Sequence, residues 1–185
     1  MTISQLILLS FIQGVTEFLP ISSSGHLIIL PKLAGFEDQG LVMDVAVHLG
    51  TLLAVIIYFW RDIYRLLFSA VNVFLNTNSQ SRFNSDFLLL IKLLVSSLPV
   101  IFMGLIFSKY FIINFRTLEI IGWTTLIFGV LLFFSDKLNM TILRINHISF
   151  SGAIFIGLMQ AVALIPGTSR SGITMTAARF LGVER

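Results

Sequence analysis

Long uncharged runs dominate the pattern of hydrophobic and polar positions along this chain. Three of these runs, residues 41–60, 87–108 and 120–135, approach the ~20 apolar residues that a helix needs to cross the hydrocarbon core of a bilayer, the third with help from tilt or from its flanking residues. Residues 61–85 form an amphipathic stretch that ends in the polar sequence NTNSQSRFNS. The pattern therefore predicts three membrane-spanning helices, with an amphipathic segment and a polar linker between the first two.

Two further apolar stretches contain breaks. Residues 3–30 are interrupted by Pro20 and a Ser-Ser-Ser-Gly run, and the uncharged residues 150–165 end at PGTSRSG. The residue before a proline resists helical geometry, and clusters of Gly and Ser favour turns. Because unpaired backbone groups are costly in lipid, irregular backbone survives only inside protein or around a polar cavity. Two interpretations are open here: a kinked span with a packed break, or a re-entrant helix–loop–helix whose tip holds a ligand.

The two breaks repeat each other in sequence. QGVTEFLPISSSG (13–25) and QAVALIPGTSRSG (160–172) align without a gap. Identical residues stand at Gln13 and Gln160, Val15 and Val162, Ser22 and Ser169, Ser24 and Ser171, and Gly25 and Gly172. This repeat favours the re-entrant interpretation. Three predicted spans separate the copies, and an odd number of crossings makes the copies enter the membrane from opposite faces, as in inverted-topology repeats.

The predicted fold class is an all-α integral membrane protein, an inverted-topology repeat with two re-entrant helix–loop–helix elements and about three full spans. We expect a single membrane domain over residues 1–185, with the first repeat half at 1–148 and the start of the second at 149–185. The second half continues for only thirteen residues after its break. Since an inverted repeat needs both halves to bury its interior, we expect this chain to be a truncated part of a longer protein.

Composition supports a membrane protein and narrows the partners. Charged residues make up 11% of the chain, whereas a soluble domain carries about 25%. The net charge of +3 is scattered and forms no basic patch interleaved with aromatic residues, so we expect no nucleic-acid partner. The chain has no Cys, which excludes disulfides, thiolate catalysis and Cys-based metal sites.

The residues of the two breaks have the chemistry of an anion site. Each break offers small residues and free backbone N–H groups at the start of a new helix, which together can form a nest for an anion. Arg170 adds a guanidinium that can hold phosphate oxygens in a bidentate way. A structural alternative pairs Arg170 with Glu17 as an internal ion pair. Either role brings the two breaks together.

Several other polar side chains near the first break are candidates for chemistry. Gln13 and Glu17 share one helix face, and Glu17 can bind a divalent cation or act as a base. His26 can transfer a proton or attack phosphorus, and we expect it to lie with Glu17 and Arg170 around one cavity. The three serines 22–24 offer hydroxyls as ligands, as a nucleophile activated by His26, or as helix N-caps.

Asp44 and His48 form a second polar pair, one helical turn apart near the start of the first predicted span. They can line the polar site or cap the entrance of the helix, and the sequence leaves both options open.

Two motifs carry a family resemblance. QGVTEFLPISSSGHL and ALIPGTSRSGITM resemble the two signature motifs of the bacterial undecaprenyl-diphosphate phosphatases, the family linked to bacitracin resistance. The first is similar to that family's pattern of an acidic or amide residue, three residues, a glutamate and a following Ser-Gly-His. The second is similar to its Pro-Gly-x-Ser-Arg-Ser-Gly pattern, and HLGTLLAVIIYFWRD also looks similar, so the resemblance covers the whole chain. The family position filled here by Gln13 is often glutamate, which weakens any mechanism that needs two carboxylates on one metal.

The resemblance implies an enzyme that removes the terminal phosphate from undecaprenyl diphosphate, an isoprenyl diphosphate lipid, and so recycles the carrier for cell-wall synthesis in the bacterial inner membrane. It implies a catalytic set of Glu17, Ser23, His26 and Arg170. The implied substrate contacts are Gln13, Ser22, Ser24, Gly25, Gly167, Thr168, Ser169 and Ser171. A divalent cation, Mg²⁺ or Ca²⁺, would assist, with Glu17 as its ligand, and a homodimer is one option for the assembly. The alternative function is a transporter or flippase of isoprenyl lipid phosphates, which has no need of a histidine and a hydroxyl placed for attack.

Overall fold

A computed structural model of the chain describes residues 1–75, 84–115, 117–138 and 143–184. Its elements are, in order, α1 (Ile3–Thr16), α2 (Ser23–Ala34), α3 (Gly40–Tyr58), α4 (Trp60–Leu75), α5 (Ser85–Asn114), α6 (Leu118–Leu138), the 3-10 helix η1 (Ile145–His147), α7 (Phe150–Ala161), the 3-10 helix η2 (Val162–Leu164) and α8 (Arg170–Phe180). The described residues contain no strand beyond one isolated bridge between Leu143 and Val183. The prediction of an all-α protein is confirmed.

The three predicted spans are also confirmed. Gly40–Tyr58, Ser85–Ile106 and Leu118–Lys137 are long and apolar enough to cross a bilayer, and at most 11% of the most apolar window of each is buried inside the protein. Apolar helices with so little burial need lipid around them, so the chain is a membrane protein. The amphipathic α4 follows α3 as expected, whereas most of the predicted polar linker falls at residues 76–83, outside the described residues.

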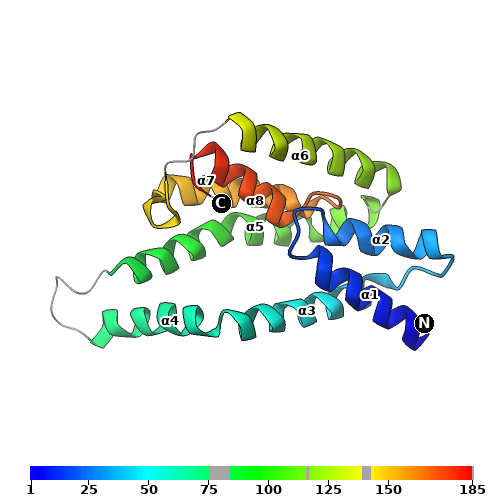
Figure 1. The fold of residues 1–185 in the computed structure, drawn as a ribbon, viewed down its shortest axis with the longest axis horizontal. Helices are drawn as coiled ribbons and strands as arrows, with labels where there is room; N and C mark the ends of the chain where they lie inside the picture. Colours follow the sequence, from blue (N-terminus) through cyan, green and yellow to red (C-terminus); the bar gives the residue numbers. More distant parts are fainter. Residues whose placement is uncertain (76–83, 116, 139–142, 185) are drawn as a thin grey trace.

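The two broken stretches form two helical hairpins whose tips meet. Figure 1 shows α1 and α2 approaching the middle of the molecule from one end, and α7 and α8 approaching it from the other. At the meeting point the Ser171 hydroxyl donates to the Leu19 carbonyl at 3.2 Å. The fully or nearly fully buried apolar side chains among the described residues come from these hairpins, from α6 and from the segment after α8: Leu9, Leu27, Ile28, Ile121, Ala153, Ile173, Ala177 and Val183. The core therefore surrounds the two breaks, while α3 and the side chains of α4 and α5 whose burial is described add no buried apolar side chain to it.

The aligned breaks are alike in local structure as well as in sequence. Ser22 is the N-cap of α2 and its Oγ accepts from the Gly25 N–H at 3.3 Å, while Ser169 caps α8 and accepts from the Gly172 N–H at 3.2 Å. A serine hydroxyl is a preferred group for this role because it satisfies a donor that the first turn leaves unpaired. The capping role expected among the three serines thus belongs to Ser22, whose backbone is held at φ 64°.

Helix α6 holds the second break in place. The Thr124 hydroxyl donates to the Pro166 carbonyl at 2.8 Å, and the Thr125 hydroxyl donates to the Gly167 carbonyl at 3.1 Å. Gly167 has φ +91°, and a Cβ there would overlap Thr124 Oγ1 and lie 2.8 Å from the Ile121 carbonyl oxygen. Only glycine fits at this position, because the backbone of the break approaches α6 directly.

Candidate active site

A cavity of about 750 Å³ lies where the two breaks face the first part of α3. Its polar wall consists of Thr16, Glu17, Ser22, Ser23, Ser24, Asp44, His48, Gln160, Thr168, Ser169, Arg170, Ser171 and Thr174. Residues more than 140 positions apart, such as Glu17 and Arg170, therefore line one space. Helix ends and loops surround this cavity. This agrees with the rule that a membrane protein carries irregular backbone only inside the protein or around a polar cavity.

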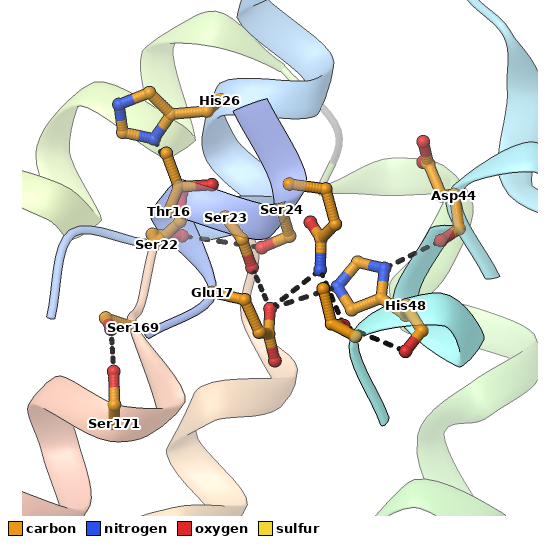
Figure 2. Close-up of polar contacts among 12 residues, drawn as sticks. Thr16, Glu17, Ser22, Ser23, Ser24, His26, Asp44, His48, Ser169 and Ser171 are labelled. Atoms are coloured by element: carbon orange, nitrogen blue, oxygen red, sulfur yellow. Dashed lines mark hydrogen bonds and ion pairs between the residues drawn. The ribbon is translucent and has the colours of Figure 1, made fainter. Parts of the chain in front are cut away.

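Glu17 is the centre of the polar contacts. Its Oε2 accepts from Gln13 Nε2 at 2.9 Å and from the Ser23 hydroxyl at 2.5 Å, and it lies 3.6 Å from His48 Nε2 (Figure 2). The three partners come from α1, α2 and α3, so contacts from three helices fix one carboxylate oxygen. A hydroxyl that donates to a fixed carboxylate is the arrangement of a nucleophile with its base.

Gln13 supports this carboxylate from within the protein. Its side chain is fully buried, also donates to Thr51 Oγ1 at 3.4 Å, and does not line the cavity. The structure therefore places Gln13 behind Glu17, where it orients the carboxylate, and not at the surface that a substrate would touch.

The pair left open by the sequence, Asp44 and His48, lines the cavity. His48 Nδ1 lies 2.7 Å from the Asp44 carbonyl oxygen, and because a carbonyl only accepts, this nitrogen carries a hydrogen and turns Nε2 toward Glu17. The largely buried Asp44 accepts from Gln39 Nε2 at 2.5 Å. The N-cap position of α3 belongs to Gln39, so neither residue stands at the entrance of the helix. In the sequence, their spacing of four residues already indicated that both side chains lie on one face of a helix.

The position of His26 corrects one expectation. His26 is absent from the cavity wall, and its Nδ1 lies 2.8 Å from the Ser22 carbonyl oxygen. Figure 2 shows its ring on the far side of Ser22 from Glu17. The expectation that Glu17, His26 and Arg170 surround one cavity holds for the first and the last and is wrong for His26, because the bond to the Ser22 carbonyl holds the ring against its own helix.

The second break adds a cation and hydroxyls to the opposite wall. Arg170 begins α8, is exposed to the cavity, and makes no ion pair with any residue in the described ranges. The alternative Arg170–Glu17 ion pair is therefore not formed, although both side chains face the same space. Thr168 is buried, and its Oγ1 has no hydrogen-bond partner among the described residues, while Ser169 and Ser171 hold their hydroxyls 3.1 Å apart.

The two glycines expected among the substrate contacts have a packing role. Neither Gly25 nor Gly167 lines the cavity. A Cβ on Gly25 would lie 3.7 Å from the Gly167 Cα and 3.2 Å from Ile121 Cγ2, so the two breaks and α6 pack directly against one another here. The sequence pattern shows that small residues are needed but does not say whether a ligand or a neighbouring helix requires them.

Comparison with known proteins identifies the family. Residues 6–185 match the model of the bacitracin resistance protein BacA, and both breaks lie inside the matched region. The chain belongs to the BacA family.

Curated relatives of this BacA-family chain are similar along its length. The protein of Jannaschia sp. (strain CCS1) is 50% identical over 186 residues, which cover 100% of this chain and 68% of the relative. The protein of Ruegeria pomeroyi is 46% identical over 189 residues, again 100% of this chain and 68% of the relative. The protein of Alcanivorax borkumensis is 46% identical over 181 residues, 98% of this chain and 67% of the relative. All three are named undecaprenyl-diphosphatase.

Proposed function

We propose that this BacA-family protein hydrolyses undecaprenyl diphosphate to undecaprenyl phosphate and inorganic phosphate. The observation that carries the proposal is one cavity in which a hydroxyl paired with a carboxylate faces further hydroxyls and a guanidinium that no described residue pairs with. A diphosphate on a membrane-embedded tail needs this combination: donors for the phosphate oxygens, a positive charge for the transition state, and a positioned nucleophile. The name of the similar proteins agrees with this chemistry.

In the proposed reaction Ser23 is the nucleophile and Glu17 its base. Glu17 takes the proton of the Ser23 hydroxyl as Oγ attacks the terminal phosphorus, and the bond from that phosphorus to the bridging oxygen breaks, which releases the isoprenyl phosphate. Water then attacks the phosphoserine and frees inorganic phosphate. The 2.5 Å contact between Ser23 and Glu17 supports this choice over His26, which does not line the cavity.

The second break holds the phosphate groups in this proposal. Arg170 provides the bidentate contact and compensates charge on the equatorial oxygens. Thr168 contributes a buried hydroxyl that no described residue uses, and Ser169 and Ser171 add two more. From the first break, Ser22 and Ser24 line the same space.

A divalent cation fits these residues as a bridge to the substrate. Within the described ranges no group of three or more His, Cys, Asp or Glu side chains forms a metal cage. Mg²⁺, however, is commonly held by one or two carboxylates together with substrate phosphates and water. Glu17, which lines the cavity, would be the protein ligand, while Gln13 behind it would hold the carboxylate in place through its Nε2. When bound, Mg²⁺ or Ca²⁺ would neutralise negative charge on the diphosphate.

For the membrane arrangement we propose that both hairpins are re-entrant and belong to an inverted-topology repeat in the bacterial inner membrane. The tips meet from opposite ends of the molecule (Figure 1), and in the sequence the three candidate spans lie between the two copies. The α1 helix has 14 residues and α7 has 12, so at ~1.5 Å per residue neither can cross the ~30 Å core alone. Residues 1–148 would be the first half and 149–185 the start of the second.

A phosphate-release assay in detergent tests the function. We expect the purified protein to release inorganic phosphate from undecaprenyl diphosphate, and Ser23→Ala to lose activity by about a hundredfold or more. Ser97→Ala is the matched control, because the Ser97 hydroxyl donates only to the Leu93 carbonyl of its own helix, at 2.9 Å. Transport has no meaning in detergent. A protein that moves the lipid across vesicles but releases no phosphate would support the flippase alternative and refute the hydrolase.

A further inference from the structure

A second cavity adjoins the first and has a different character. It measures about 350 Å³ and shares Glu17, Val45, His48 and Arg170 with the larger cavity. The rest of its wall belongs to α3 and is apolar except for one hydroxyl: Leu49, Thr51, Leu52 and Val55. A charged end and an apolar body therefore form one continuous space with the candidate active site.

The apolar wall is a single face of α3. Positions 45, 49, 52 and 55 recur at intervals of four, three and three residues, which places them in one line along a helix. Ten residues of helix extend about 15 Å. Leu49 and Leu52 keep 55% and 51% of their surface exposed, and α3 packs chiefly on α1 and α4 within the described part of the chain. Space for an elongated apolar group therefore starts at Glu17 and continues along this face.

We propose that this face of α3 seats the first isoprene units of the lipid tail while the diphosphate occupies the larger cavity. The inference rests on the proposed function, since it assigns a place to the part of that substrate that does not react. An isoprenyl diphosphate has a charged head joined directly to a branched hydrocarbon, and the two connected cavities have the same order of charge and apolar surface. Tail contacts would supply binding energy in proportion to the apolar area removed from water, and through van der Waals packing where they replace lipid.

A rival route for the tail would start at Leu41, one of the apolar residues in the wall of the larger cavity, in the first turn of α3. That residue lies at the end of the candidate span Gly40–Tyr58, near the level of the membrane surface, whereas Leu49 and Leu52 lie in its middle. A hydrocarbon tail must reach the hydrocarbon core, so the exit in the middle of the span is the favoured one.

Leu52 and Leu53 provide a matched pair for the test. Both are leucines of α3 with nearly equal exposure, 51% and 53%, but only Leu52 lines the second cavity. Phosphate release is measured for Leu52→Trp and Leu53→Trp with C5, C15 and C55 isoprenyl diphosphates. We expect Leu52→Trp to lose about tenfold in kcat/KM for the C15 and C55 substrates and to stay within about twofold for C5, while Leu53→Trp matches the parent on all three. Equal losses on all three substrates, or the tail-dependent loss in Leu41→Trp instead, would overturn the proposal.

A binding experiment separates this inference from the proposed function. The parent protein is irradiated with a farnesyl diphosphate that carries a diazirine on its terminal isoprene unit, and the labelled peptides are mapped. We expect labels on residues 49–55. Inorganic pyrophosphate, added as a competitor, should not block these labels completely. Labels confined to the region of Leu41 would refute the proposed tail site on α3. If the parent releases no phosphate but is labelled on α3, the hydrolase proposal fails and the tail site stands.

Discussion

Replacing Gly167 with alanine should unfold the junction between the two breaks. The residue has φ +91°, a backbone conformation that costs a non-glycine residue about 1–3 kcal/mol. The added Cβ would overlap Thr124 Oγ1 and lie 2.8 Å from the Ile121 carbonyl oxygen and 2.9 Å from its Cα, and overpacking of this kind costs a further ~1–3 kcal/mol. Displacing Thr124 would also weaken its 2.8 Å hydrogen bond to the Pro166 carbonyl, worth about 0.5–1.5 kcal/mol.

The combined cost is therefore about 3–7 kcal/mol, a large part of the ~5–15 kcal/mol that stabilises a typical folded protein. Thermal unfolding of Gly167→Ala in detergent, followed by tryptophan fluorescence, should show a midpoint well below that of the parent. Gly14→Ala is the control, because Gly14 lies in α1 with no atom within 4 Å of its added Cβ and should be neutral or slightly stabilising. Removing the Thr124 hydroxyl should restore only part of the loss, since the contacts with Ile121 are to backbone. Equal midpoints for Gly167→Ala and the parent would refute the close approach of the break to α6.

Three further predictions concern the candidate site. Arg170→Lys should lower phosphate release about a hundredfold with a normal unfolding midpoint, because a point charge cannot replace a bidentate fork; near-parental hydrolysis would count against the clamp. His48→Leu should lower kcat about tenfold with little change in KM, because it removes one of the three partners of Glu17, and His48→Gln should recover activity because its side chain can still place a polar group beside that carboxylate; equal loss in both variants would contradict a positioning role. Ser22→Ala should cost about 0.5–2 kcal/mol of stability through the lost cap, whereas Ser24→Ala should cost less, since its hydroxyl meets Ser22 Oγ only at 3.4 Å; the reverse order in thermal unfolding would show that the cap is misassigned.

Local sequence was sufficient for the spans and for the positions of the breaks. The length of an uncharged run is a direct measure of whether a helix can cross a bilayer, and Pro20 and the Ser and Gly clusters favour turns and the starts of new helices. The ungapped repeat placed Ser22 and Ser169 at equivalent positions, and both cap their helices through the same hydrogen bond, although their backbone φ values differ (64° and −71°). These features depend on residues within one or two turns of each other, so they can be read from the chain alone.

The roles of individual side chains were decided by the tertiary structure. His26 follows the serines in the motif, yet its ring bonds to the Ser22 carbonyl and lies outside the cavity, whereas His48, far from either motif in sequence, lies beside Glu17. Gln13 is buried behind that carboxylate, and Gly167 is required by the backbone of α6. The physical reason is the same in each case: where a side chain points depends on its hydrogen-bond partner and on the helix packed against it, and both are supplied by residues distant in the sequence.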